Sequence, residues 1–581
     1  MDTQFPFSPF FFIACIFFFF ITIIITGLKS LKSLDANRKL PPQPWKLPLI
    51  GHIHHLVGGP PHRVLRNIAQ KLGPIVHLQL GQVSAIVISS PTLAKEIMKT
   101  HDVSFANRPK LLSAEIVSYN YTDIAFSPYG DYWRQMRKIC VLELLSAKKV
   151  QSFRSVREQE SQNLIDWLAM QRFNVVNLSH MIFMMMSSIT CRITFGSRFD
   201  DQEMLVKTIQ KSIEASSGFD VSDLFPSVTL LALITGTRGK LLKIRNKIDG
   251  MLDRIISDHQ ERRVGQKNHH ENEDLVDVLM RLKDDDSLQF PLPLDSIKSV
   301  ILDMFSAGTD TSAVTIEWAM SELMKNPRVM KKVKDELMQA FKGKKTINEL
   351  DIQELDYLKL VIKETLRLHP PAPFLLPREC RESCEIAGYH IPVKTKVIIN
   401  AWMIGRDPDY WTDPESFIPE RFSESSVTMM GTDFEFIPFG AGRRMCPGTT
   451  MGLANVELPL AKLLYHFDWE LPNGAPAEDL DMFESFGAIL KRKNNLLLVP
   501  RPYDTNSVKS LKSENVTSIQ NRRLKTLLWS LKTPLERASK DASLWALRRR
   551  QADRAEPQVR FKPAYKSGVY MRLKTPVEKG S

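Results

Sequence analysis

A loop of glycines, prolines and arginines around one cysteine, residues 436–448, is the strongest constraint on what this 581-residue chain can fold into. It reads Phe-Ile-Pro-Phe-Gly-Ala-Gly-Arg-Arg-Met-Cys-Pro-Gly, and an apolar stretch with helical spacing, residues 453–467, follows it. Glycines let a flat ligand approach the backbone closely. Cys446 lies beside Arg443 and Arg444 and near a predicted helix N-terminus, so we expect a lowered thiol pKa and a metal-binding thiolate. A cysteine that only packs would not require this frame.

A second unusual stretch, Ala-Gly-Thr-Asp-Thr-Ser at 307–312, lies inside a predicted helix over 294–325. Glycine and threonine are unfavourable in helix interiors, so their clustering requires a reason. Within this cluster the acid Asp310 stands next to the alcohol Thr311. The alternative is a helix whose polar side chains only bond to their own backbone.

Five residues of the cysteine loop match the signature Phe-x-x-Gly-x-Arg-x-Cys-x-Gly, and through it the chain resembles the cytochrome P450 family of haem-thiolate enzymes. These are Phe439, Gly442, Arg444, Cys446 and Gly448. The resemblance implies that they bind haem b, iron protoporphyrin IX, with Cys446 as the metal ligand. It also implies that Arg444 contacts a haem propionate.

Other motifs extend the resemblance. Trp133 and Arg137 match a Trp-x-x-x-Arg helix that holds a propionate, and Arg108 and Arg378 are further propionate candidates. The resemblance also implies catalytic roles for two residues: Thr311 would stabilise the oxygen group bound at the haem iron, and Asp310 would deliver protons toward it.

A structural network is expected away from the haem. Glu364 and Arg367 are spaced i, i+3 on a predicted helix and can pair on one face. Pro-Glu-Arg-Phe at 419–422 resembles the family motif whose arginine joins such a pair. The resemblance therefore implies a network of Glu364, Arg367 and Arg421.

The predicted fold is mainly α with minor β. Helical spacing covers 150–170, 240–262, 294–325 and 329–341, strands are predicted at 394–400 and 496–499, and β-branched runs at 75–80 and 83–88 predict a hairpin. We find no internal repeat. The resemblance implies a single large P450 domain over 52–503.

The N-terminus predicts a membrane anchor. Residues 5–28 carry no charge and approach the ~20 residues that span a bilayer as a helix. A basic, proline-rich linker at 29–51 follows, and the basic side would face the cytosol. We therefore expect a single-pass protein of the endoplasmic reticulum membrane whose catalytic domain is cytosolic.

The net charge of +13 comes mostly from one segment. Residues 504–581 contain 18 basic and 7 acidic residues, or 18 − 7 = +11, which leaves +2 for the rest. This tail has no counterpart in the family, and its composition predicts poor order. The charge is therefore weak evidence for nucleic acid, and no nucleic-acid partner is expected.

Cys380 and Cys384 have a spacing that could suit zinc or redox chemistry, but no second ligand pair accompanies them. The low density of cysteines, six in the chain, indicates a reducing compartment. We interpret the two as free thiols.

The body most resembles the plant microsomal P450 group, and within it the terpenoid hydroxylases, with indole-alkaloid hydroxylases as an alternative. The resemblance implies a monooxygenase that uses oxygen and electrons from NADPH through a separate reductase, with cytochrome b5 as an optional further donor and a lipophilic substrate. Two other readings stay open: an oxygen-independent haem-thiolate enzyme, which would not need Asp310 and Thr311, and a non-catalytic membrane haem protein or pathway scaffold.

Overall fold

The computed structural model describes residues 39–198, 201–215, 220–265, 273–285, 288–485 and 487–503. The predicted anchor at 5–28, the first part of the predicted linker and the tail at 504–581 lie outside the described residues. Among the helices of the described ranges, none is both long enough and apolar enough to cross a bilayer.

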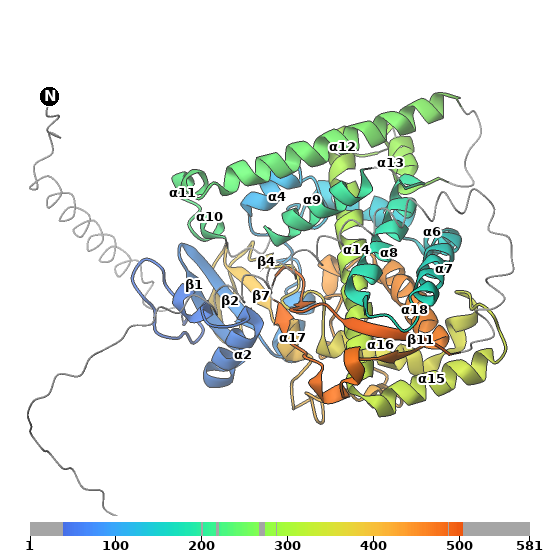
Figure 1. Ribbon diagram of the computed structural model, residues 1–581. Helices are drawn as coiled ribbons and strands as arrows, with labels where there is room; N and C mark the ends of the chain where they lie inside the picture. Colours follow the sequence, from blue (N-terminus) through green and yellow to red (C-terminus); the bar gives the residue numbers. More distant parts are fainter. Residues whose placement is uncertain are drawn as a thin grey trace, which may run out of the picture. The chain divides into compact units, whose positions relative to one another are not determined.

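The helical part is built around α14 (Leu294–Lys325), whose side chains are buried along most of its length. It packs against α8 (Leu178–Phe195), α16 (Asp356–Leu368) and α18 (Thr449–His466), as Figure 1 shows. A helix covered on several sides must be apolar around most of its circumference. Thr309, Asp310 and Ser312 of the stretch 307–312 are accordingly buried.

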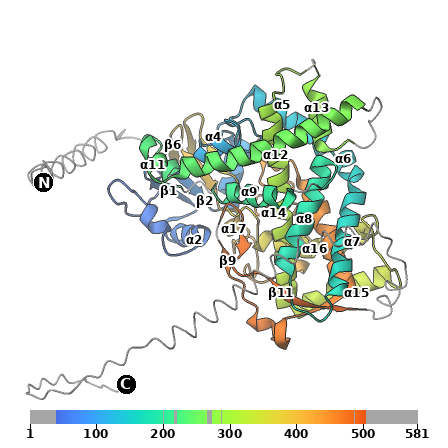
Figure 2. The ribbon, with the colours of Figure 1, turned by 45° about the horizontal axis from the view of Figure 1, so that its top comes forward.

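Further helices surround this centre. Helix α12 (Thr237–Gly265) crosses over α9 (Gln202–Glu214) in both ribbon views (Figures 1 and 2). The other α-helices are α2 (Pro61–Leu72), α3 (Pro91–Lys95), α4 (Leu112–Val117), α5 (Asp131–Ile139), α6 (Ala147–Ser152), α7 (Arg154–Met170), α10 (Val221–Leu224), α11 (Thr229–Ile234), α13 (Leu275–Lys283), α15 (Pro327–Phe341) and α17 (Ala401–Ile404).

The main sheet has the order β1-β2-β7-β4. Its strands are β1 (Ile75–Leu80), β2 (Val83–Ile88), β7 (Lys396–Ile399) and β4 (Arg378–Glu379). β1 and β2 form an antiparallel hairpin in which Leu80 pairs with Val83, β7 adds parallel to β2, and β4 adds antiparallel to β7. The sheet thus brings residues near 80, 380 and 398 together.

Three small sheets complete the described strands. β3 (Val176–Asn177), β11 (Leu497–Pro502) and β8 (Phe467–Glu470) form one, β9 (Glu484–Ser485) and β10 (Lys491–Arg492) the second, and β5 (Cys384–Ile386) and β6 (Tyr389–Ile391) the third.

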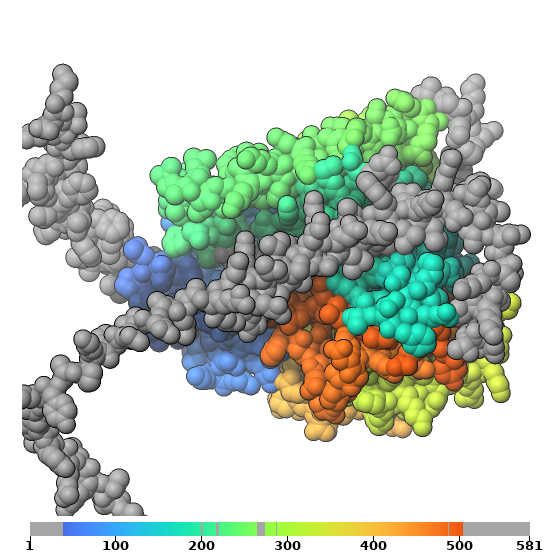
Figure 3. Space-filling model, in the orientation of Figure 1, coloured from blue at the N-terminus to red at the C-terminus, as the bar shows by residue number. Residues whose placement is uncertain are grey.

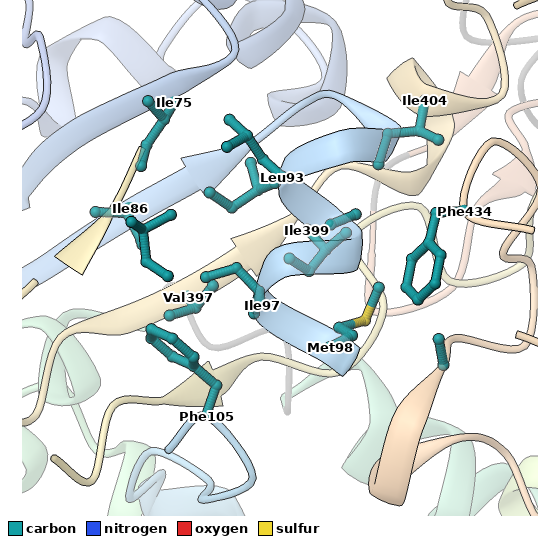
Figure 4. Packing of buried hydrophobic residues seen from close by; sticks show 14 of the residues in the cluster. Ile75, Ile86, Leu93, Ile97, Met98, Phe105, Val397, Ile399, Ile404 and Phe434 are labelled. Carbon is teal, nitrogen blue, oxygen red and sulfur yellow. The ribbon is translucent and has the colours of Figure 1, made fainter. Parts of the chain in front are cut away.

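One face of the main sheet is covered by α3 and the wide helical turn η2 (Glu96–Thr100) that continues it. Figure 4 shows Leu93, Ile97 and Met98 on this segment facing Ile399 of β7 and Phe434. The cluster is almost fully buried and also includes Cys380. It fixes the segment 93–102 against the sheet and, through it, the residues that contact the cysteine loop.

The predicted hairpin at 75–80 and 83–88 and the predicted helix at 294–325 coincide with β1, β2 and α14. The prediction of one helix over 150–170 was wrong in detail, because α6 ends at Ser152 and α7 begins at Arg154. The described part of the predicted linker is extended and bonded to the domain: the His77 N–H donates to the Pro42 carbonyl at 2.8 Å, and Gly51 bridges to Leu80.

Candidate functional site

Cys446 stands between a short helical turn, η6 (Gly442–Arg444), and the start of α18. Its backbone N–H donates to the Phe439 carbonyl at 2.9 Å, which closes the loop. The side chain is accessible to solvent, yet the surrounding protein atoms desolvate the thiol and raise its pKa. An accessible sulfur in a crowded environment fits a ligand that reaches it inside the protein.

The expectation of a thiol pKa lowered by Arg443 and Arg444 was wrong. Burial dominates, and among the charged neighbours it is Arg137 that favours the thiolate. Arg444 directs its guanidinium to the carbonyls of Ala106, Ile124 and Ser127 instead. Thiolate formation at Cys446 would therefore require a metal to replace the proton.

Position 442 requires a glycine because the segment 98–102 approaches its backbone closely. Its φ is +66°, and a Cβ there would lie 2.2 Å from the Met98 carbonyl oxygen and 2.7 Å from Oδ1 of Asp102. A Cβ on Gly448 would lie 3.9 Å from the Cys446 sulfur, an ordinary contact. Gly442 thus lets the loop dock on 98–102, and Gly448 leaves the space beside the sulfur open.

Asp102, which the sequence motifs did not point to, ties this docking together. It accepts hydrogen bonds from the Arg443 backbone N–H at 2.8 Å and from Nη1 of Arg378 at 2.9 Å. Arg378 also donates to the Ala441 carbonyl at 2.7 Å. One carboxylate therefore links the helical turn η2, strand β4 and the cysteine loop.

Four arginines predicted to bind propionates gather near the loop: Arg108, Arg137, Arg378 and Arg444. Burial lowers the pKa of each guanidinium. Repulsion from Arg378 lowers the pKa of Arg444 further. Repulsion from Arg444 and Arg378 lowers the pKa of Arg108 further. Two carboxylates, Asp102 and Asp123, counteract this shift for Arg378, Arg108 and Arg444, and Asp102 is shared with Arg443.

This donor set fits haem. The buried arginines outnumber the carboxylates beside them, which suits a ligand that itself carries carboxylates, because these form charge-assisted bonds to arginine. The nearby thiol is a ligand for iron. The residues that would hold haem are therefore Cys446 and the four arginines, while Phe439 contributes the carbonyl that closes the loop.

Trp133, for which the motif implies a propionate contact, lies beside two of these arginines. Its indole N–H donates to the Ile124 carbonyl at 3.1 Å. Its ring lies 4.3 Å from the Arg444 guanidinium and 5.6 Å from that of Arg137, and Arg137 donates to the Met445 carbonyl at 2.7 Å. Trp133 therefore orients the two arginines through cation–π contacts.

Asp310 and Thr311 lie on α14. Thr311 donates its hydroxyl to the Ala307 carbonyl, one turn back. Asp310 is buried, and its Oδ2 forms an ion pair with Nζ of Lys491 at 3.0 Å. Lys491, in β10, was not predicted from sequence, because 181 residues separate it from Asp310.

The predicted network of Glu364, Arg367 and Arg421 is assembled. Glu364 accepts from Nε of Arg367 at 2.6 Å and from Nε of Arg421 at 3.0 Å. Glu364 and Arg367 are both fully buried. Arg367 also donates to the carbonyls of Gly405 and Pro414, so the network ties α16 to the loop before Pro419.

The family model for cytochrome P450 matches residues 41–499. The chain belongs to the cytochrome P450 family. This confirms the family predicted from the cysteine loop, and with it the prediction of a P450 monooxygenase that carries haem iron.

Several curated plant proteins are similar to this P450 over most of their length. Premnaspirodiene oxygenase of Hyoscyamus muticus is 53% identical over 84% of this chain and 97% of its own. Germacrene A hydroxylase of Barnadesia spinosa is 54% identical over 84% and 97%. Amorpha-4,11-diene 12-monooxygenase of Artemisia annua is 53% identical over 82% and 96%.

A solved zebrafish cytochrome P450 with progesterone shares the fold of this P450. The TM-score is 0.66 at 23% sequence identity, and the match covers 77% of this chain and all of the zebrafish chain. The predicted P450 fold, mainly helical with minor sheet, is thereby confirmed.

Proposed function

We propose that this P450 is a membrane-anchored haem-thiolate monooxygenase that oxidises a hydrophobic plant terpenoid, a sesquiterpene or diterpene. The observation that carries the chemistry is the accessible Cys446 thiol beside buried arginines that outnumber the carboxylates near them. In this proposal NADPH supplies electrons through a separate reductase, with cytochrome b5 as an optional further donor.

When bound, haem would supply oxygen activation and electron storage. The chain would contribute Cys446 as the iron ligand and Arg108, Arg137, Arg378 and Arg444 as propionate ligands. Asp310 would receive protons near Lys491, whose side chain is 37% exposed, and pass them toward the Thr311 hydroxyl inside α14. Burial of Asp310 keeps bulk water from this step.

The substrate class rests on the relatives. The three named above oxidise premnaspirodiene, germacrene A or amorpha-4,11-diene according to their names, and each is at least 53% identical to this chain. High identity over nearly the whole of each relative supports a terpenoid substrate here. The indole-alkaloid alternative has no such observation in its favour.

Exposed apolar side chains support attachment to a membrane. Leu230, Leu233 and Ile234 of α11 are 58%, 64% and 72% exposed, and Leu49 and Ile50, in the turn between Leu47 and Gly51, are also exposed. The β1–β2 turn joins the two groups, since the Gln82 N–H donates to the Leu224 carbonyl and the Gly81 N–H to the Ile50 carbonyl. In Figure 3 the green α10–α11 atoms adjoin the blue β1–β2 region. Such a patch suits the interfacial region of a bilayer.

The test is expression of the full chain in yeast microsomes with a plant reductase. We expect a thiolate-type Soret band in the reduced carbon monoxide complex, which Cys446→Ser abolishes. Microsomes offered premnaspirodiene, germacrene A, amorpha-4,11-diene, diterpenes and indole alkaloids should form an NADPH- and oxygen-dependent product from a terpene. A normal spectrum with products only from alkaloids would overturn the substrate, and a normal spectrum with no product at all would overturn the monooxygenase assignment.

A further inference from the structure

Two cysteines next to the main sheet are held in fixed positions by backbone hydrogen bonds. Cys380 follows β4, where its N–H donates to the Thr395 carbonyl at 2.9 Å and its carbonyl accepts from the Lys394 N–H at 2.8 Å. Cys384 begins β5 and pairs across the ladder with Ile391 of β6. Neither residue contributes to the haem site described above.

The two side chains meet on one side of the β5–β6 ladder. The Cys380 sulfur lies 3.0 Å from the Glu382 carbonyl oxygen and 3.8 Å from that of Ile391, the residue opposite Cys384. Cys384 shares a strand face with Ile386, two residues on, and both pack in the cluster that contains Cys380. Each thiol also acts on the pKa of the other, which agrees with this placement.

The pair is asymmetric in access and acidity. Cys380 is completely buried, whereas Cys384 is partly exposed. The Cys380 thiol lowers the pKa of the Cys384 thiol, whereas the Cys384 thiol and burial raise that of Cys380. Since the thiolate is the nucleophile, Cys384 is suited to attack and Cys380 to resolve.

We propose that Cys384 and Cys380 form a modification site for low-molecular-weight disulfides, with oxidised glutathione as the probe. The Cys384 thiolate attacks one glutathione sulfur, which forms a mixed disulfide and releases one glutathione thiolate. Cys380 then loses its proton to water and attacks the Cys384 sulfur, which releases the second glutathione. Two protein thiols become a disulfide and one glutathione disulfide becomes two thiols, so no further oxidant is required.

The site lies beside a cofactor-binding arginine of the proposed haem site. Arg378, two residues before Cys380, bonds to Asp102 and Ala441, and the Arg381 N–H donates to the Ser104 carbonyl at 2.8 Å. A disulfide would close residues 381–383 into a small loop next to these contacts. The modification itself does not depend on the proposed function.

The test uses the purified full-length holoenzyme. It is incubated with oxidised glutathione, its remaining thiols are trapped with N-ethylmaleimide under acid conditions, and it is digested with trypsin. Cleavage after Arg378, Arg381 and Lys394 puts the two cysteines on separate peptides, residues 379–381 and 382–394. We expect these peptides to be joined by a disulfide that dithiothreitol releases.

Single variants test the order of events. Cys380→Ser should stop the reaction at a stable glutathione adduct on Cys384, and Cys384→Ser should leave Cys380 unmodified. In the reduced wild type, native alkylation of Cys384 should be roughly tenfold faster than that of Cys380. Ser383→Ala, which lies between the cysteines and keeps both, is the matched control and should still give the joined peptides.

The carbon monoxide spectrum of each variant shows whether the domain is folded. With folded protein, absence of the joined peptides in wild type and Ser383→Ala overturns the proposal. So does a glutathione adduct on Cys380 in Cys384→Ser, because the buried thiol would then be the one that attacks.

Discussion

Nζ of Lys491 in β10 lies 3.0 Å from Oδ2 of Asp310 in α14, and the pair joins a partly exposed ammonium to a buried carboxylate. The other oxygen, Oδ1, is buried and has no hydrogen-bond partner among the described residues. Lys491 therefore provides most of the compensation for the buried negative charge of Asp310. Asp310 can turn toward Thr311 only by loosening this pair.

Lys491→Met is expected to uncouple NADPH use from product formation. The variant keeps a side chain of similar length but removes the charge that holds Asp310, so proton delivery loses its orientation. We expect the ratio of product formed to NADPH consumed to fall roughly tenfold. Stability should also fall, by about 1–2 kcal/mol, a value reduced from that of a fully buried pair because Lys491 is partly exposed.

Lys491→Arg and Lys493→Met distinguish a positioning role from a structural one. Arginine should restore much of the coupling ratio because it keeps the positive charge. Lys493 is an exposed neighbour of Lys491, and its replacement should change neither quantity. A wild-type coupling ratio in Lys491→Met would show that the ion pair has no part in proton delivery.

Glu364→Gln should destabilise the fold. The neutral amide would leave the fully buried Arg367 without its carboxylate, and breaking a buried pair in this way costs about 3–5 kcal/mol. Denaturant unfolding of the holoenzyme measures the loss. Glu203→Gln is the control: its pair with Lys207 lies at the surface of α9, and the substitution should cost at most about 1 kcal/mol.

Local patterns predicted much of this fold and less of the site. Hairpin β1–β2 and helix α14 were predictable because β-branched alternation and helical spacing act over neighbouring residues. Asp102 and Lys491 were not predictable, since their partners Arg378 and Asp310 lie 276 and 181 residues away in the chain, and no local pattern records such packing. The raised pKa of Cys446 was missed for a related reason: burial outweighs the adjacent arginines that the sequence displays.

Arg108→Met should weaken the stabilisation that haem gives. In the apoprotein the substitution removes a positive charge that Arg444, Arg378 and Arg137 repel. The relief of this repulsion offsets part of the stability that the substitution costs. With haem bound, it removes a propionate ligand, and hydrogen bonds to charged groups contribute about 1.5–3 kcal/mol. The difference in unfolding free energy between holo and apo protein should shrink by that amount.

Arg245→Met serves as the control for Arg108→Met. Arg245 also donates to a buried carbonyl, that of Ile116 at 3.3 Å, and lies over the Tyr119 ring, but it is outside the arginine cluster. Its replacement should lower holo and apo stability equally. An equal loss in Arg108→Met would contradict a role in holding haem.

The apolar surface of α11 should contribute to membrane binding. In a chain that begins at residue 39, replacement of Leu233 and Ile234 by serine removes two large exposed side chains. Each buried side chain of this size contributes about 1.5–3 kcal/mol, so flotation with phospholipid vesicles should show at least roughly tenfold weaker binding. Val57→Ser, an equally exposed residue outside this surface, is the control, and equal effects would contradict a specific contact.

His77 should make the domain less stable as the pH falls below about 6.5. Burial, with some repulsion from His52 and Lys46, lowers its pKa to about 4, whereas an unfolded histidine titrates near 6.5. Between these values the unfolded chain binds a proton that the native protein excludes, so the stabilisation is complete above pH 6.5 and is lost toward pH 4. The loss from this group reaches about 3 kcal/mol. Denaturant unfolding of wild type and His77→Gln from pH 4.5 to 7.5 should show that the free energy of unfolding depends less steeply on pH in the variant. His101→Gln is the control and should follow the wild type. Parallel curves for all three proteins would exclude His77 as the source.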